Sequence, residues 1–299
     1  MKQEPNTSAG STATNPMSDD VADSNLQTRR FGGISRVYGD EGFNRIAAAH
    51  VCVIGIGGVG SWVVESLARS GLGAISMIDM DVVSESNINR QLLATSDSVG
   101  RDKVLVMQDR VLQINPTCKV GAIDDFISRD NLPELIKPDF DYVIDCIDDF
   151  RVKAALIHHC KKNKIKILTV GGAGGQIDPS KVKQCDLSRT KQDVLLARTR
   201  KLLRQDYGFA RNLKRSFGIA SVYSDEQLVY PDGEGGLSSE KPHSQHSAEA
   251  SPEADQDLPS NALNCAGGMG SISHLTGTFA FHACAFVLNQ IVQAQTSNQ

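Results

Sequence analysis

Hydrophobic residues in the first half of the chain gather in three short, largely uncharged runs at residues 51–56, 74–80 and 142–147. Runs of this length that are rich in Val and Ile predict strands buried on both faces of a parallel sheet. Helical patterns follow them at 62–70, 103–114 and 150–162. This alternation predicts an α/β fold with a doubly wound, mostly parallel, Rossmann-like sheet and a C-terminal extension.

The regions on either side of this pattern are helical in character. Residues 33–49 hold apolar groups at helical spacing, separated by Gly39 and Gly42, which predicts two short helices at the sheet edge. Residues 269–292 are apolar enough to raise the question of a membrane span, but Ser, Thr, His, Asn and Gln are spread through them. We therefore expect a C-terminal core helix, which could lie at a dimer interface, and no membrane span.

The break after the first run carries the strongest chemical pattern. Gly55, Gly57 and Gly60 have the spacing G-x-G-x-x-G between a predicted strand and a predicted helix. Such glycines permit a tight turn, backbone approach to a phosphate and close packing of the helix on the sheet. The helix would point N–H groups at whatever lies over Gly58 and Ser61, which predicts a nucleotide phosphate site. The alternative is a tight turn without a ligand.

Acids end the other two strands. Asp79 lies 19 residues after Gly60 and is followed by Asp81, where a doubly wound nucleotide fold holds a ribose hydroxyl. A solvated strand end is the alternative. Asp148 and Asp149 follow the third run, where a carboxylate suits Mg²⁺ carried in with nucleotide phosphates. Because Asp149 is placed to cap the next helix, Asp148 is the better metal candidate.

A polar run with positive charge lies between these strands. Residues 86–91 read Ser-Asn-Ile-Asn-Arg-Gln, and Lys103 follows at the start of a predicted helix. Together Arg90 and Lys103 supply more positive charge than a pyrophosphate held by backbone alone requires. They favour a triphosphate whose charge is stabilised as it leaves. Taken singly, each is also consistent with an ordinary surface residue.

In this order, the motifs resemble the ubiquitin-activating-enzyme-like superfamily of the ThiF, MoeB and HesA type. They are GIGGVGS at 55–61, D-x-D at 79–81, N-x-N-R-Q at 87–91, Lys103 and D-C-I-D at 145–148. The resemblance covers about residues 30–175. It implies a homodimer that binds ATP and Mg²⁺ and adenylates a carboxylate, releasing pyrophosphate.

The resemblance also implies roles for individual residues. Gly55, Gly57, Gly58 and Gly60 would hold phosphates together with Lys103, Asp79 the ribose and Asp148 Mg²⁺, while Arg90 would reach into the partner subunit's site. Arg90, Lys103 and Asp148 are the implied catalytic residues. The other implied nucleotide-binding positions are Ser61, Asp81, Asn87, Asn89 and Gln91.

Segments at 170–204, 217–231 and 264–272 resemble more closely the bacterial tRNA threonylcarbamoyladenosine dehydratase family. That resemblance implies that ATP activates the carboxylate of threonylcarbamoyladenosine at position 37 of tRNA, which then closes on its own carbamoyl group. Cys265 matches a cysteine that this family associates with sulfur-transfer partners, such as a cysteine-desulfurase relay. An inert, half-buried thiol is the alternative.

Three other functions share parts of the pattern. A sulfur-carrier adenylyltransferase would share all the motifs, but such enzymes usually bind zinc through CxxC pairs, and no two of the 7 cysteines are three apart. We therefore expect no zinc and a reduced, cytoplasmic protein. An NAD-dependent oxidoreductase would have no use for Arg90, Lys103 and Asp148 together. A non-catalytic protein would bind ATP and leave pyrophosphate unreleased.

Charge is unevenly distributed along the chain, whose net charge is −4. Residues 1–27 are polar and acidic, and residues 232–260 are rich in Ser, Glu, Pro and His, so we expect a disordered tail and a disordered insertion. The two histidines of the insertion, His243 and His246, are more consistent with solvated residues than with a metal site. Residues 28–299 then form a single adenylating domain.

Positive charge gathers between residues 189 and 215, where nine Lys or Arg stand against two acids. An acidic chain with a local basic stretch is typical of a nucleic-acid-binding protein with acidic tails. We expect Arg200, Arg204 and Arg211 to contact tRNA. The alternative is a solvated helix face.

Overall fold

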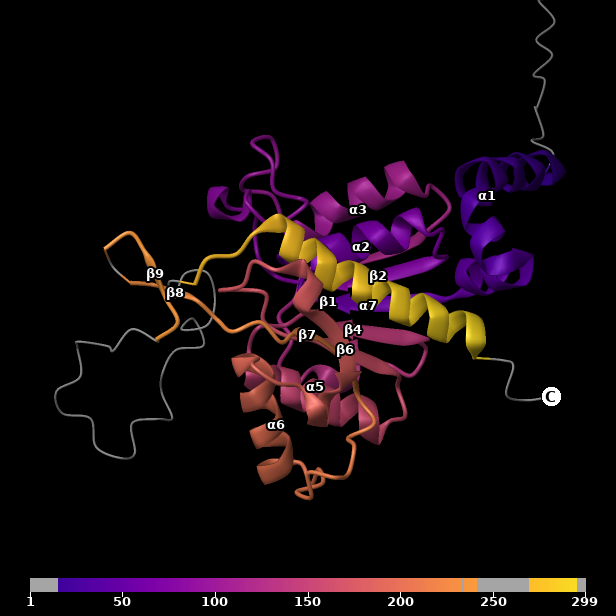
Figure 1. Ribbon diagram of the computed structural model, residues 1–299. Helices are drawn as coiled ribbons and strands as arrows, with labels where there is room; N and C mark the ends of the chain where they lie inside the picture. The colour runs from indigo at the N-terminus through magenta and orange to yellow at the C-terminus, as the bar shows by residue number, and fades with distance from the viewer. Residues whose placement is uncertain (1–15, 233, 241–268, 295–299) are drawn as a thin grey trace, which may run out of the picture.

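The Val- and Ile-rich run before the glycines forms the centre of a parallel sheet. The protein, as a computed structural model, is described over residues 16–232, 234–240 and 269–294. Seven strands follow one another across the sheet (Figure 1) in the order β3 (Lys119–Ile123), β2 (Ala74–Ile78), β1 (His50–Ile54), β4 (Tyr142–Asp145), β5 (Ile167–Val170), β7 (Ala220–Ser224) and β6 (Val182–Asp186).

This topology confirms the predicted doubly wound α/β fold. Neighbouring strands are parallel throughout, except that β6 runs antiparallel to β7 at one edge. β1 pairs with β2 on one side and with β4 on the other, so the strand order reverses direction at the β1–β4 pair. Ligands of open α/β sheets bind outside the carboxyl ends of the strands at such a switch point.

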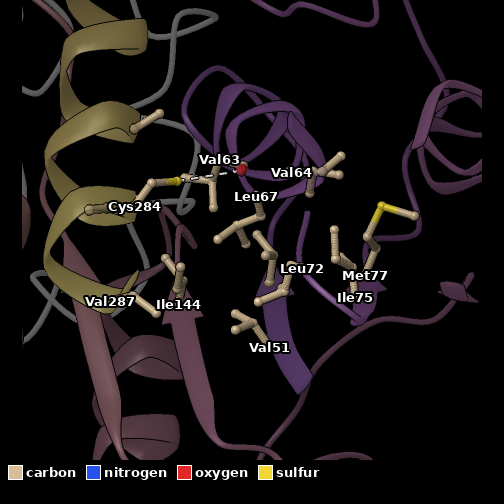
Figure 2. Packing of buried hydrophobic residues seen from close by; sticks show 14 of the residues in the cluster. Val51, Val63, Val64, Leu67, Leu72, Ile75, Met77, Ile144, Cys284 and Val287 are labelled. Carbon is tan, nitrogen blue, oxygen red and sulfur yellow. Dashed lines mark hydrogen bonds between the residues drawn. The ribbon is translucent and has the colours of Figure 1, made fainter. Parts of the chain in front are cut away.

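Helices cover both faces of the sheet. On one face lie α2 (Gly60–Arg69), α3 (Lys103–Ile114) and α7 (Ser273–Gln293), and on the other lie α5 (Phe150–Lys162) and α6 (Val194–Asp206). Each face has its own hydrophobic cluster. Figure 2 shows part of the first, where Val63 and Leu67 of α2 lie between Val51 of β1 and Cys284 of α7.

The C-terminal helix α7 is part of this core. Among the described residues it is the one helix long and apolar enough to cross a membrane, with a mean hydropathy of 1.4. However, 56% of its most apolar 18-residue stretch is buried inside the protein. The thiol of Cys284 donates to the carbonyl oxygen of Val63 at 3.5 Å (Figure 2). The core helix expected at 269–292 is therefore confirmed, because its apolar side chains pack on α2 and the sheet.

The first helix, α1 (Pro16–Ala48), differs partly from expectation. Its backbone is interrupted at Gly39, with φ of 73° and ψ of 163°, so two helices meet there as predicted. It also begins inside the range 1–27 that was expected to be a disordered tail. Contacts near its middle stabilise it, since Arg30 donates to the carbonyl oxygens of Gln113 at 2.9 Å and Ile114 at 2.7 Å. Residues 1–15 lie outside the described part.

The predicted insertion at 232–260 begins with ordered structure. A two-stranded hairpin pairs β8 (Tyr230–Pro231) with β9 (Leu237–Ser238), and Asp232 accepts hydrogen bonds in the turn from the backbone of Glu234 and Gly236. Residues at the start of the expected insertion are therefore paired locally in this hairpin. Residues 241–268 lie outside the described part. The predictions for His243, His246 and Cys265 fall within this range. The remaining elements are α4 (Leu132–Leu135) and the short turns η1 (Glu85–Asn87), η2 (Pro179–Lys181) and η3 (Leu187–Arg189).

Candidate nucleotide-binding site

The glycine loop joins β1 to α2 at the switch point of the sheet. Gly55 has φ of +83°, and a Cβ there would lie 3.0 Å from the carbonyl oxygen of Cys146. A Cβ on Gly60 would lie 1.9 Å from the carbonyl oxygen of Gly55, so only glycine lets α2 approach the strand. At Gly57, in contrast, a Cβ would meet nothing nearer than 3.9 Å. Packing does not explain that glycine, whereas close approach of a ligand would.

The amino terminus of α2 faces this loop without compensation from its own side chains. Val59 at the N-cap makes no side-chain cap, and the first turn holds no acid. The positive end of the helix dipole is therefore available to an anion. Ser61 was expected to bind the nucleotide, but it is fully buried. Its hydroxyl donates to the carbonyl oxygen of Gly57 at 2.7 Å and accepts from the backbone of Leu92 at 3.1 Å, so its side chain shapes the loop instead.

Asp79 lies at the end of β2, directly beside the glycine loop. Its carboxylate accepts the backbone N–H of Ile56 at 2.6 Å and that of Asp81 at 2.8 Å. Burial raises the pKa of the Asp79 carboxyl, against the lowering effects of Lys103 and of these hydrogen bonds. The structure therefore brings the predicted ribose acid to the loop and gives it a second task, which is to hold the loop in place.

Asp81 and Lys103 form an ion pair that sequence reasoning missed, although it named both residues. The ammonium of Lys103 lies 2.7 Å from a carboxylate oxygen of Asp81, and its backbone N–H donates to the Asp81 carbonyl oxygen at 3.0 Å. Lys103 is 4% exposed, whereas the Asp81 side chain is 65% exposed. The pair holds a buried positive charge at the start of α3, close to the end of β2.

The polar run at 86–91 is fixed by its own hydrogen bonds and by α2 and α7. Asn87 is buried, and its side-chain oxygen accepts from the backbone of Ser84 at 3.1 Å. Asn89 donates to the carbonyl oxygen of Ser271 at 2.8 Å. The Arg90 carbonyl oxygen accepts from the indole of Trp62 and the hydroxyl of Thr276. Both asparagines thus position the segment.

The other two polar side chains of this run, those of Arg90 and Gln91, differ in how fully they are paired. The guanidinium of half-exposed Arg90 donates to the carbonyl oxygen of Ser86 at 2.6 Å and to the side chain of Asn89 at 3.0 Å. Gln91 is 6% exposed, and its side-chain oxygen lacks a hydrogen-bond partner. Its amide nitrogen lies near Gly57. An unpaired buried acceptor is costly, so a donor on a bound ligand would stabilise it.

The end of β4 is organised around a buried ion pair. Asp145 and Lys153 are both fully buried, with 2.9 Å between the carboxylate and the ammonium. Asp145 also accepts from the hydroxyl of Thr169 at 2.7 Å and from the backbone of Ile147 at 3.1 Å. These contacts fix the turn that leads to Asp148, which is exposed.

The two acids after β4 have different roles. Asp149 caps α5, because its carboxylate accepts from the backbone of Arg151 at 2.7 Å and of Val152 at 3.3 Å. The predicted cap is confirmed, and Asp148 is left as the acid that faces solvent at this strand end. In the described ranges, no group of three or more His, Cys, Asp or Glu residues could hold a metal by itself.

Asp193 is a site-shaping residue that sequence reasoning overlooked. It caps α6 by accepting from the backbone of Leu196 at 2.8 Å, and it accepts from Gly172, in the loop after β5, at 3.0 Å. Burial raises the pKa of its carboxyl to about 6, although hydrogen bonds, Lys153 and Arg200 act in the opposite direction. An acid before a helical pattern indicates a cap, but nothing in the spacing indicates burial against the β5 loop.

The arginines expected to contact tRNA lie on and after α6, apart from the glycine loop. Arg200 is half-buried and donates to the hydroxyl of Thr190. Arg204 lies over the ring of Phe217 at 5.0 Å. Arg211 is exposed. Arg200 and Arg204 therefore make structural contacts, which leaves Arg211 as the exposed cation of the three.

Comparisons with known proteins agree with this geometry. A family model described as the ThiF family matches residues 30–207. The chain belongs to this family. Within it, the chain is 46% identical over 268 residues to tRNA threonylcarbamoyladenosine dehydratase of Haemophilus influenzae, covering 90% of this chain and 95% of that protein. It is 44% identical to the Escherichia coli enzyme of the same name, over 91% and 97%.

A solved structure of a ThiF-family relative has the same architecture. The E. coli dehydratase in complex with ATP matches this chain with a TM-score of 0.78 and 40% identity, covering 92% of this chain and 98% of that one. Recognition of the superfamily from its motifs is confirmed, as is the closer resemblance to the bacterial dehydratases.

Proposed function

We propose that this protein is an ATP-dependent enzyme that dehydrates N6-threonylcarbamoyladenosine at position 37 of tRNA. ATP transfers AMP to the threonyl carboxylate and releases pyrophosphate. The activated carboxyl then closes on the carbamoyl group of the same nucleoside and releases AMP. The net change in the nucleoside is the loss of one water.

The observation that carries the proposal is the agreement between two kinds of likeness. Relatives named for this reaction are 46% and 44% identical over at least nine-tenths of the chain. The glycine loop, Asp79 and Lys103 also meet at the switch point, where such a sheet holds a nucleotide. A nicotinamide enzyme would use the glycines and Asp79 but not the buried cation of Lys103.

Each residue has a task that its position supports. The glycine loop and the start of α2 would hold phosphates, and Asp79 the ribose. Lys103, buried and paired with exposed Asp81, would offer its ammonium to phosphate oxygens. Asn89 and Gln91 would lie beside the nucleotide. Asn89 is held there by its hydrogen bond to Ser271, and the unpaired side-chain oxygen of Gln91 could accept a hydrogen bond from the ligand.

Asp148 fits a magnesium site of the kind that nucleotides bring with them. Mg²⁺ in such sites keeps several waters and takes one or two carboxylates together with substrate phosphates. A single exposed carboxylate at the end of β4 matches that donor set, and no cage of protein ligands is needed. When bound, the metal would neutralise phosphate charge as pyrophosphate departs. We propose Mg²⁺, and no zinc, as the metal requirement.

The resemblance to the family also suggests the oligomeric state of the protein and its location in the cell. We propose a homodimer in which Arg90 completes the partner's site, since Arg90 is half-exposed and can reach a neighbouring subunit. The six described cysteines are free, which supports a reduced, cytoplasmic setting. A sulfur relay through Cys265 stays a prediction, because that residue lies outside the described part.

The decisive experiment is mass spectrometry of tRNA nucleosides. Purified protein, ATP, Mg²⁺ and threonylcarbamoylated tRNA are incubated, and a product lighter by one water is expected together with AMP and pyrophosphate. Unchanged nucleoside with no pyrophosphate would refute the proposal. Pyrophosphate release only with a small ubiquitin-like protein would favour the sulfur-carrier alternative.

A binding experiment tests the nucleotide separately. Calorimetry should give tighter binding of ATP than of NAD, and Asp148→Ala should abolish the Mg²⁺-dependent part of turnover without changing the fold. Asp149→Ala is the informative comparison, because it removes a helix cap and should lower the free energy of unfolding by about 1 kcal/mol. Tighter binding of NAD, or indifference to Mg²⁺, would contradict the adenylating function.

A further inference from the structure

A cavity lies at the far end of α5 from the nucleotide site. It has a volume of about 470 Å³ and is formed by the end of α5 and the segment after α6. Its lining residues are His158, Lys161, Lys162, Tyr207, Gly208, Phe209, Ala210, Arg215, Ser216 and Phe217. A volume of this size lies within the range of small-molecule sites and accommodates more than a single phosphate group.

The charged residues that line the cavity all carry the same sign. Lys161, Lys162 and Arg215 contribute three positive charges, and no acid is among the described lining residues. Lys161 is held in place, because its ammonium donates to the carbonyl oxygen of Phe217 and lies 5.0 Å from the ring centre of Phe209. Lys162 and Arg215 are exposed. The site is therefore built for an anion.

Four of the other lining residues carry aromatic rings. Phe209 and Phe217 meet edge to face, with ring centres 5.0 Å apart. The rings of His158 and Tyr207 lie 4.8 Å apart at 37°. Burial and the neighbouring Lys162 lower the pKa of His158, which keeps its ring neutral near pH 7. Phe209 and Phe217 are buried, so the aromatic wall open to a ligand is formed by the half-exposed rings of His158 and Tyr207. This wall beside the exposed Lys162 and Arg215 matches a nucleotide, which joins a planar base to a phosphate.

The cavity and the glycine loop lie toward opposite ends of the parallel strands. α5 begins beside Asp148 and Asp149 and has 13 residues, so the helix is about 20 Å long from end to end. α6 packs against α5 and ends at Asp206, with Tyr207 as its C-cap. A ligand in this cavity would therefore not contact the nucleotide site, whereas a large RNA could reach both.

We propose that this cavity binds a nucleotide of the substrate RNA other than the one that reacts, with its phosphate on Lys162 and Arg215 and its base on the aromatic wall. The inference rests on the proposed function for the identity of the RNA. It moves the expected tRNA contacts from Arg200 and Arg204, which hold the protein's own groups, to cations at the end of α5 and in the loop after α6. Binding remote from the reacting base orients the substrate.

The test is equilibrium binding of threonylcarbamoylated tRNA to the full-length protein without ATP, at several salt concentrations. Lys162→Glu with Arg215→Glu should weaken binding at least tenfold and reduce the salt slope by about two. Tyr207→Leu keeps an apolar side chain but removes the ring, and should weaken binding about fivefold or more with the slope unchanged. Arg36→Glu with Lys119→Glu is the matched control, since it reverses the same charge at exposed positions on the other half of the sheet.

Each outcome is decisive. If the control weakens binding as much as the cavity variant, or if neither changes the slope, the cavity does not bind RNA and the inference is wrong. If tRNA binds as expected but is not dehydrated, the inference stands and the proposed reaction fails. If ATP titration gives two sites per chain and the cavity variant loses one, the ligand is a free nucleotide and the RNA assignment is overturned. If the double charge reversal fails to fold, Lys162→Ala with Arg215→Ala repeats the test.

Discussion

Replacing Lys153 by methionine should strongly destabilise the protein. Lys153 and Asp145 are both fully buried, with 2.9 Å between their charged groups. Methionine fills a similar volume but removes the ammonium, so it leaves the Asp145 carboxylate charged and buried. Thr169 and the backbone of Ile147 still donate to that carboxylate, but neither carries a charge.

The expected magnitude follows from this geometry. Breaking a buried pair by removing one partner lowers the free energy of unfolding by about 3–5 kcal/mol. For a domain of this size, that loss corresponds to a fall in Tm of roughly 10 °C. Adding Asp145→Asn should recover part of it, because the amide can still accept from Ile147 and donate to Thr169. The double variant should therefore be more stable than Lys153→Met alone.

Urea unfolding followed by circular dichroism measures these differences. Lys183→Met is the matched control, because Lys183 pairs with Asp225 at the surface and its side chain is 52% exposed. That change should lower the free energy of unfolding by less than about 1 kcal/mol. The reasoning is refuted if Lys153→Met costs no more than Lys183→Met, or if adding Asp145→Asn makes the protein still less stable.

Three further predictions concern the site. Gly60→Ala should abolish ATP binding and lower Tm, as seen by calorimetry, because its Cβ would lie 1.9 Å from a backbone oxygen; wild-type affinity would contradict the close packing. Inactive Arg90→Ala and Lys103→Ala proteins, mixed as heterodimers, should regain turnover if Arg90 serves the partner's site, whereas no recovery places Arg90 in its own. The raised pKa of Asp193, about 6 against an ordinary 3.8, means that the fold binds more protons than the unfolded chain between those values. Stability should therefore fall, by on the order of 3 kcal/mol, as pH rises from 4 through 6, and Asp193→Asn should flatten that part of the urea-measured profile.

The pattern of hydrophobic residues predicted the helices and strands because their formation depends mainly on residues close together in the sequence. α3 and α5 have the predicted bounds, since each begins after an acid and ends where its apolar spacing ends. β1 ends at Ile54, two residues before the predicted end, because Gly55 takes a positive φ that leaves the strand. The β8–β9 hairpin was not predictable from a composition that favours disorder.

The partners within the site were less accessible to sequence reasoning. Lys103 and Asp81 were both named, but their pairing depends on how α3 meets the end of β2. Lys153 has no pattern that distinguishes it from a solvated lysine on the same helix. Arg200 is similar, because its burial against Thr190 depends on the packing of α6. Charge counted along the chain does not separate such residues from those that face a ligand.

Three carboxylates at the carboxyl ends of the strands accept hydrogen bonds from backbone N–H groups of the neighbouring loops. Asp79 binds the N–H of Ile56 after β1, Asp145 that of Ile147 after β4, and Asp193 that of Gly172 after β5. Each therefore fixes a loop that follows a parallel strand, in the row where ligands bind. An acid engaged in this way has little capacity left for a metal, whereas exposed Asp148 keeps both oxygens available. The same division applies to the cations, since Lys153 neutralises a buried acid whereas the partner of Lys103 is exposed. Under the proposed function, a phosphate could therefore take the place of Asp81 beside Lys103, while the Asp145–Lys153 pair stays in the framework that positions the loops.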